Sequence, residues 1–167
     1  MIQKNVLHQQ IGTTFNESAK SEAAKIARDV YLMCRAAQES VLQSVASGLK
    51  VADRVLGDYG AVNLDDNGET VSWQAVNQFT KQARNIQLPK MNAGKTWLGQ
   101  ISDPSVSAPV VDEVKKLVGG TVTVFQRMND EGDMLRVATN VIKKDGSRAI
   151  GTYIPKTNPD GSPNPVV

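Results

Sequence analysis

The fold is decided by residues 121–142, which read TVTVFQRMNDEGDMLRVATNVI. Threonine and valine dominate the start of this stretch, and apolar and polar side chains alternate from Leu135 onward. Both features are typical of β-strands, and the polar run Asn129-Asp-Glu-Gly132 between them favours a turn. The stretch therefore predicts two antiparallel strands joined by a short connection.

Downstream of this pair the same pattern continues once more. Lys144-Asp-Gly146 indicates a second turn, and residues 148–154 are expected to form a third strand. Residues 155–167 are rich in Pro, Asn and Gly, so we expect an extended tail. The C-terminal third thus predicts an antiparallel meander of three strands.

Upstream, short elements are separated by loop signals. Residues 110–118 have helical apolar spacing, and residues 100–109 contain the Ser, Asp and Pro of a loop. A strand is expected over residues 83–88, ended by Pro89. Asp66-Asn67-Gly68 is a tight-turn signal, which predicts a hairpin between two short strands.

Residues 16–58 predict one long helix, some 60 Å in length at about 1.5 Å per residue. Asn16 is the expected N-cap, and Gly57 and Gly60 are expected to end the helix. The mean apolar step is about 3.7 residues, which does not specify a left-handed coiled coil. Apolar residues recur along one face of it at Ile26, Val30, Met33, Ala37, Val41, Val45, Leu49, Ala52 and Leu56.

These elements predict an α+β fold in two parts. Residues 1–58 are the expected tail and long helix, which is too long for one small domain to cover and favours a partner helix from a second subunit. Residues 59–167 are the expected α+β region. The alternative is that the helix packs only against the sheet of its own chain.

Bulk composition limits the functions open to the chain. The 167 residues are 40% hydrophobic and 22% charged with a formal net charge of +2, which fits a soluble globular domain and argues against nucleic-acid binding. No apolar stretch approaches the roughly 20 residues of a membrane span, and the first residues lack a signal-peptide pattern. Cys34 is the single cysteine, so neither an internal disulfide nor a c-type haem motif is expected.

The sequence contains partial matches to cofactor and metal motifs, but each lacks a required residue. Gly94-Lys-Thr96 matches the end of a phosphate loop, but Pro89 stands where the first glycine is needed. The run from Asn63 to Gly68 resembles the start of a calcium loop, but the position of the bidentate glutamate is Gln74. The single histidine, His8, has no neighbour to tune it. We therefore expect no enzyme, no cofactor and no metal site.

Polar side chains within the apolar strands suggest a binding site instead. The planar donor fork of Arg136 or Arg148 suits a carboxylate ligand. The polar partners expected around these anchors are Thr139, Asn140, Thr152 and Tyr153, with Trp97 as an apolar wall. The alternative is structural: Arg136 pairs with an acid such as Asp133 or Asp145, and Arg148 caps a turn.

Several blocks of the chain, in the same order, resemble the Cache 3/Cache 2 fusion sensor domain of methyl-accepting chemotaxis proteins. The resemblance runs from about Val51 to the last residue. The blocks are TVFQRMN (123–129), GDMLRVATNV (132–141), DGSRAIGTYIP (145–155) and NPDGSPNPVV (158–167), with WQAVNQFT (73–80), LPKM (88–91), TWLGQ (96–100) and VVDEV (110–114) upstream.

This resemblance implies a periplasmic sensor with a PAS-like antiparallel sheet, anchored in the bacterial inner membrane by the full-length protein. It implies homodimers formed through the long helix, and small ligands such as carboxylates, amino acids or amines. The family continues beyond the last block with further strands, so the C-terminal strands of the family are expected to be missing. An exposed edge of the meander is then expected to be covered by a second subunit or by the tail.

Two other classes of function stay open on the sequence. The same type of sensor occurs on histidine kinases, so the output domain is open. The sequence is equally open to a dimerisation or interaction module that binds nothing small. An enzyme is the weakest interpretation.

Overall fold

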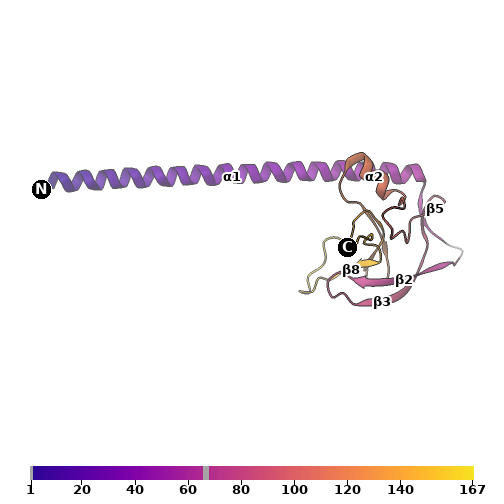
Figure 1. The fold of residues 1–167 in the computed structure, drawn as a ribbon. Helices are drawn as coiled ribbons and strands as arrows, with labels where there is room; N and C mark the ends of the chain where they lie inside the picture. Colours follow the sequence, from indigo (N-terminus) through magenta and orange to yellow (C-terminus); the bar gives the residue numbers. More distant parts are fainter. Residues whose placement is uncertain (1, 66–67) are drawn as a thin grey trace. The chain divides into compact units, whose positions relative to one another are not determined.

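The computed structural model describes the backbone of residues 2–65 and 68–167, and the side chains of residues 12–65 and 68–167 (Figure 1). The chain divides into two compact units, residues 1–47 and residues 48–167. The elements are, in order, α1 (Ile2–Tyr59), β1 (Val62–Leu64), β2 (Thr70–Asn77), β3 (Ala83–Pro89), β4 (Met91–Ala93), β5 (Thr96–Trp97), α2 (Val111–Val118), β6 (Thr123–Arg127), β7 (Met134–Thr139) and β8 (Thr152–Ile154). This element order confirms the expected α+β class.

The long helix α1 is confirmed and ends before Gly60, whereas Gly57, which was also expected to end it, lies inside the helix. Tyr59 is its last residue, and Gly60 follows with a φ of 121°, a value that favours glycine. The expected cap at Asn16 is wrong, because α1 begins at Ile2. Residues 2–15 contain no proline and only one glycine, Gly12, so no strong helix breaker precedes Asn16.

Within residues 12–47, the apolar side chains of α1 are exposed. Phe15 is 74% exposed and Met33 is 72% exposed, and the other large apolar residues of this segment are exposed as well. In the described part of the chain, no helix combines the length and the apolar character needed to cross a bilayer.

In the second unit, the described strands form a five-stranded sheet in the order β3-β2-β8-β7-β6. The antiparallel order β6-β7-β8 of the meander is confirmed, with Gln126 opposite Leu135 and Leu135 opposite Tyr153. The third strand was expected over residues 148–154 but spans only Thr152–Ile154, so Arg148 lies outside it. One pairing was not expected: β8 lies parallel to β2, with Val76 opposite Thr152. The sheet is therefore mixed, and the short β8 occupies its middle.

Three short strands form a second sheet, in the order β1-β4-β5 within the described residues. Val62 pairs with Ala93 in this sheet, whereas β2 pairs with β3. The predicted hairpin around Asp66-Asn67-Gly68 is therefore wrong, because the strands before and after this run, β1 and β2, each pair with another strand. Asp66 and Asn67 of the predicted turn lie outside the described residues.

The turn at Gly94 touches the C-terminal end of α1. Gly94 has a φ of 58°, and a Cβ atom at this position would overlap the carbonyl oxygen of Tyr59. The N–H of Gly94 donates to the carbonyl of Ala61 at 2.9 Å. Gly94, the first residue of the Gly94-Lys-Thr96 run, thus lies in close contact with the end of α1.

Two apolar clusters pack on opposite faces of the five-stranded sheet. Side chains alternate along β7, so Leu135 and Val137 point one way, and Arg136 and Ala138 point the other. Leu135 and Val137 belong to a cluster with Trp73, Ala75, Leu88, Met128 and Tyr153. Ala138 belongs to a cluster with Val55, Ala93, Leu98, Ala108, Val110, Val111 and Val114.

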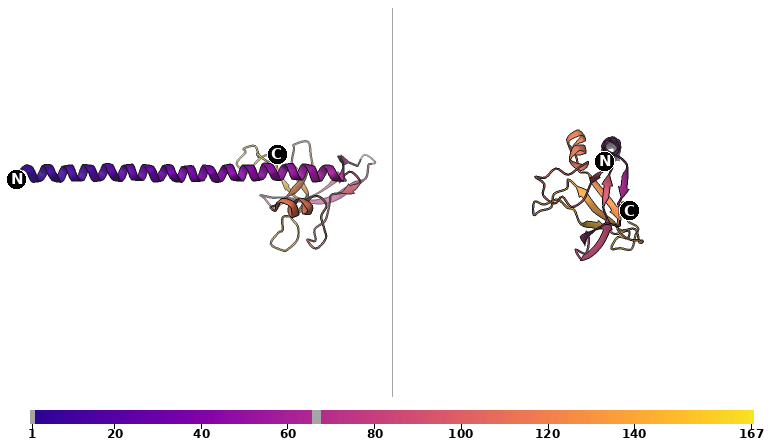
Figure 2. Two further views of the ribbon diagram at one scale, coloured as in Figure 1. Left: turned by 90° about the horizontal axis from the view of Figure 1, so that it is seen from above. Right: turned by 90° about the vertical axis from the view of Figure 1, so that its right-hand side faces the viewer.

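The second cluster joins α2 to the last turns of α1. Val111 and Val114 of α2 are buried against Val55, and Val51 and Leu56 pack at the same place. The right-hand view of Figure 2 shows α2 and the end of α1 on the same side of the strands. The predicted helix over residues 110–118 is confirmed, one residue shorter at its start.

The tail is folded, and the expectation that it is extended is wrong. The N–H of Asn158 donates to the carbonyl of Ser162, and Thr157 and Pro163 form an isolated bridge. The N–H of Lys156 donates to the Asp133 carboxylate at 3.0 Å, which holds the tail against the turn between β6 and β7. Asn and Asp side chains stabilise such turns through local hydrogen bonds, so the Asn-Pro-Asp-Gly composition folds back on itself.

Candidate functional site

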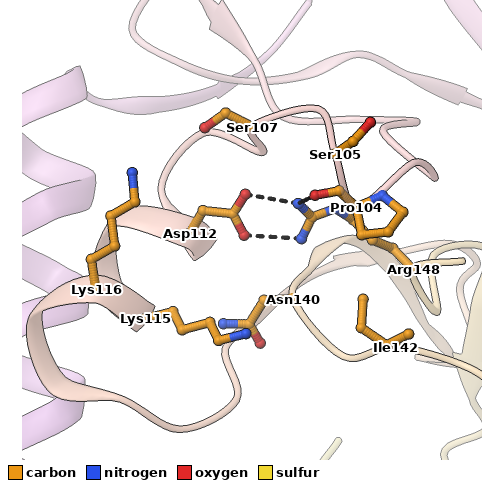
Figure 3. A pocket seen from close by; sticks show the side chains of 9 residues that line it. All are labelled: Pro104, Ser105, Ser107, Asp112, Lys115, Lys116, Asn140, Ile142 and Arg148. Carbon is orange, nitrogen blue, oxygen red and sulfur yellow. Dashed lines mark hydrogen bonds and ion pairs between the residues drawn. The ribbon is translucent and has the colours of Figure 1, made fainter. Parts of the chain in front are cut away.

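A hollow of about 580 Å³ lies between α2 and the segment that connects β7 to β8 (Figure 3). It is open to solvent. Its lining residues are Pro104, Ser105, Ser107, Asp112, Lys115, Lys116, Asn140, Ile142 and Arg148. Two of these, Asn140 and Arg148, belong to the binding residues predicted from the sequence.

Arg148 and Asp112 form a bidentate ion pair in this hollow. The guanidinium donates to the two carboxylate oxygens of Asp112 at 2.9 and 2.8 Å. Arg148 is 4% exposed, and Figure 3 shows the two groups facing each other. The Arg148 guanidinium also donates to the backbone carbonyls of Thr139, Val106, Pro104 and Asp103. All its donor groups are thus engaged by the protein itself.

The ion pair keeps the Asp112 carboxylate charged. Burial raises the pKa of Asp112, but hydrogen bonds from Arg148 and from the N–H of Ala108 lower it more, so its pKa lies below the ordinary value. The N–H of Ala108 donates to the carboxylate at 2.8 Å. The carboxylate therefore connects α2, the loop before it and the loop that carries Arg148.

Asn140 and Thr139 are buried and also fully engaged. The Asn140 side-chain oxygen accepts from the N–H of Val122, and its amide donates to the carbonyls of Val111 and Gly120. The Thr139 hydroxyl is shared with Thr123 at 2.8 Å and also contacts the carbonyl of Val122 at 3.0 Å. These side chains fix the end of β7 against the loop between α2 and β6.

Arg136 has a different environment. Its Nη1 donates to the Thr152 hydroxyl at 2.9 Å and lies 3.5 Å from the carbonyl of Ala149. Its Nε is buried and has no hydrogen-bond partner, the only such side-chain atom in the described part of the chain. No hydrogen bond from its Nη2 occurs within the described residues, so one edge of the donor fork is uncommitted.

The acids proposed as structural partners of Arg136 are bound elsewhere. Asp133 pairs with Arg84 at 2.9 Å, and Asp145 pairs with Lys143 at 3.3 Å. The guanidinium carbon of Arg136 lies over the Phe125 ring, 5.5 Å from its centroid. Burial lowers the pKa of Arg136 from its ordinary value, but an arginine remains charged in proteins. Arg136 is therefore a half-buried cation without a carboxylate.

The remaining predicted residues lie apart from this pair. Tyr153 is buried on the opposite face of the sheet, where its hydroxyl accepts from Asn77 and its ring contacts Arg84. Trp97 is 37% exposed in the three-stranded sheet, with Lys90 over its ring. The structure thus brings Arg136 and Thr152 together, and Arg148 and Asn140 together, but does not gather all seven residues at one place.

Sequence reasoning missed Asp112, Lys115 and Lys116. All three lie in the helix over residues 110–118, where an acid in the first turn and bases in the last turn are ordinary helix features. Asp112 could be identified only from the fold, which places the first turn of α2 next to Arg148. Among the described residues, no group of three or more His, Cys, Asp or Glu side chains is placed to hold a metal ion.

Comparison with known proteins identifies one family. The family model described as the Cache 3/Cache 2 fusion domain matches residues 8–167, which is most of the chain. No curated protein and no solved structure matches the chain.

Proposed function

The chain belongs to the Cache 3/Cache 2 fusion domain family, a family of extracellular sensor domains, and we propose that it is the non-catalytic, ligand-sensing domain of a bacterial chemoreceptor. Cache domains in general bind small molecules. In our proposal the domain faces the periplasm, its full-length protein is anchored in the inner membrane, and its ligand carries a carboxylate.

The uncommitted edge of Arg136 is the observation that supports a carboxylate. A buried cationic N–H without a partner costs free energy, on the order of 1–3 kcal/mol. The Nε and Nη2 atoms of an arginine point in parallel and match the two oxygens of a carboxylate. A ligand carboxylate on this edge would supply the acceptors that the protein does not.

Thr152 is proposed to orient this anchor. Its hydroxyl accepts from Nη1 of Arg136 and in turn donates to the carbonyl of Ala149 at 3.0 Å. The contact holds the guanidinium by one side and turns the Nε–Nη2 edge away from Thr152. Phe125, directly opposite Arg136 on β6, is proposed to form one wall of the site.

Arg148, Thr139 and Asn140 are proposed to shape the domain rather than to anchor the ligand. A ligand carboxylate could bind Arg148 only by displacing Asp112 or a backbone carbonyl. Such a displacement would leave a buried acceptor or charge unpaired, which is costly. Of the two predicted arginines, Arg136 is therefore the better anchor.

A thermal-shift titration of the whole chain with short mono- and dicarboxylates tests this function. A ligand at about 100 times its dissociation constant stabilises by about 2.7 kcal/mol, or roughly 5–10 °C in a domain of this size. Arg136→Met should abolish the shift, and Arg54→Ala, on a side chain that is 82% exposed, should keep it. Absence of a shift with every acid, or equal shifts in Arg136→Met and the unmodified chain, would contradict the carboxylate site.

We further propose that the domain signals as a homodimer formed through α1. The support is the row of exposed apolar side chains in residues 12–47, including Val30, Val41 and Val45. Such side chains lose contact with water when a second helix covers them. Ligand binding would shift the dimer between two arrangements only by its difference in affinity for them.

A further inference from the structure

The hollow beside α2 carries positive charge that the protein does not neutralise. Its lining contains three cations, Arg148, Lys115 and Lys116, and one anion, Asp112. Arg148 and Asp112 neutralise each other in their bidentate pair. Neither Lys115 nor Lys116 has an ion pair within the described part of the chain, so two positive charges remain.

The base of the hollow is held rigidly by groups that need no ligand. Arg148 and Asn140 are each 4% exposed, and their donors are already paired with the protein. In Figure 3 both lysines extend from α2 on one side of the ion pair, and Ser107 lies above Asp112. A ligand would therefore meet two exposed ammonium groups and an exposed hydroxyl around a centre held by the ion pair.

We propose that this hollow is a second anion site, separate from Arg136, which takes a small doubly charged oxyanion group such as phosphate. Two ammonium groups balance its two negative charges, and lysine binds phosphate as a compact point charge. The Ser107 hydroxyl can donate to a further oxygen. Ile142 and Pro104 provide apolar surface beside the charged group.

Binding here would act on the end of α1 through α2. The lysines occupy the exposed side of α2, whereas Val111 and Val114 on its buried side pack against Val55 of α1. An anion on the exposed side of α2 would lie across the helix from the α1 contact, and a helix with its side chains is about 10–12 Å in diameter. The site is thus placed to regulate the helix that we propose to carry the signal.

Titration of the ¹⁵N-labelled whole chain with inorganic phosphate, at constant ionic strength set with chloride, tests the proposal. We expect saturable amide shifts confined to residues 104–116 and 139–148. Lys115→Gln with Lys116→Gln should weaken phosphate binding about tenfold or more, since two charge contacts are lost. Lys115→Arg with Lys116→Arg should retain binding, because both charges are kept.

Two controls separate this site from other effects. Lys20→Gln with Lys25→Gln removes the same charge from α1 and should leave the phosphate response unchanged. Arg136→Met should also leave the phosphate response unchanged. Loss of the carboxylate response therefore does not imply loss of phosphate binding. Amide shifts that are absent, unsaturable, or equally strong in the Lys115 and Lys116 double variant would overturn the proposal.

Discussion

The Arg148 guanidinium and the Asp112 carboxylate meet at 2.9 and 2.8 Å although they lie 36 residues apart. Asp112 lies in the first turn of α2, and Arg148 lies in the segment before β8. The same guanidinium contacts backbone carbonyls of the loop before α2 and of Thr139 at the end of β7. One side chain therefore holds together the loop, the helix and the sheet.

Asp112→Ala should lower the free energy of unfolding by about 3 kcal/mol, since removing one partner of a buried ion pair leaves the other uncompensated. We expect the lower end of the usual range, because the Asp112 side chain is 18% exposed. Urea denaturation measures the change. Glu113→Ala, on the exposed neighbouring position, should cost little; equal losses in the two variants would contradict the structural importance of the ion pair.

Acidification should destabilise the domain between about pH 4 and pH 2. Asp112 has a pKa below its ordinary value of 3.8, so its contribution is present above that value and is lost as the pH falls through the folded-state pKa. Hydrogen bonds from the N–H and the hydroxyl of Ser147 lower the pKa of Asp145 to about 2, and its contribution has the same sign. Denaturation of the unmodified chain and Asp112→Asn at several pH values should show a flatter profile for the variant; parallel profiles would contradict it.

Arg136→Met should leave the free energy of unfolding unchanged or raise it by about 1 kcal/mol, because the substitution removes a buried donor that has no acceptor. Arg148→Met should lower the same quantity by about 3–5 kcal/mol, because it strands the Asp112 carboxylate. Urea denaturation of the two variants measures both free energies of unfolding, and only Arg148→Met is expected to lower this quantity. A loss for Arg136→Met as large as for Arg148→Met would show that Arg136 has a structural partner.

Gly94→Ala should destabilise more than a substitution that only strains the backbone. Gly94 and Gly146 both have positive φ, 58° and 84°, but a Cβ atom at Gly146 meets nothing. Gly146→Ala should therefore cost about 1 kcal/mol from backbone strain alone. Gly94→Ala adds a clash with the Tyr59 carbonyl and should cost at least about 2 kcal/mol more; equal costs would contradict the close approach of α1 and β4.

Replacing Val30 and Val41 of α1 with Asp should abolish dimer formation in sedimentation equilibrium, because each charge would be buried without a partner. Both residues are exposed within the monomer, so the variant should fold normally by circular dichroism. Replacing Lys20 and Lys25 with Gln serves as the control and should leave the dimer intact. A monomeric unmodified chain would contradict a homodimer formed through α1.

Local pattern was sufficient to predict the long helix and the three strands of the meander. β-Branched content predicted β6, alternation predicted β7, and an apolar run between turn signals predicted a strand that includes β8. Apolar spacing without proline predicted α1. All these signals depend on neighbours in sequence. The parallel contact between Val76 and Thr152 joins residues far apart in the chain, and no local pattern encodes it. The prediction of a hairpin at Gly68 failed for the same reason, because the partner of each flanking strand is set by packing.

The sequence predicted which types of residue could form a binding site, but not how these residues are arranged in space. The sequence predicted both Arg136 and Arg148 in strands, but only Arg136 lies in one, since Arg148 precedes β8. It could not indicate that one arginine meets a carboxylate and the other does not. That difference depends on Asp112, which α2 brings to Arg148 through the packing of Val111 and Val114. Asp133 is close in sequence to Arg136, and Asp145 is close to Arg148. Both acids form ion pairs with other residues, Asp133 with Arg84 and Asp145 with Lys143.

The most direct test of the central claim is the ¹⁵N NMR signal of the Arg136 Nε–H group, recorded with and without the carboxylate that stabilises the domain most. We expect a downfield shift of this proton and slower exchange with water when the ligand binds, with the corresponding signal of Arg148 unchanged. A ligand that binds while the Arg136 signal stays in place, or that moves the Arg148 signal instead, would contradict Arg136 as the anchor.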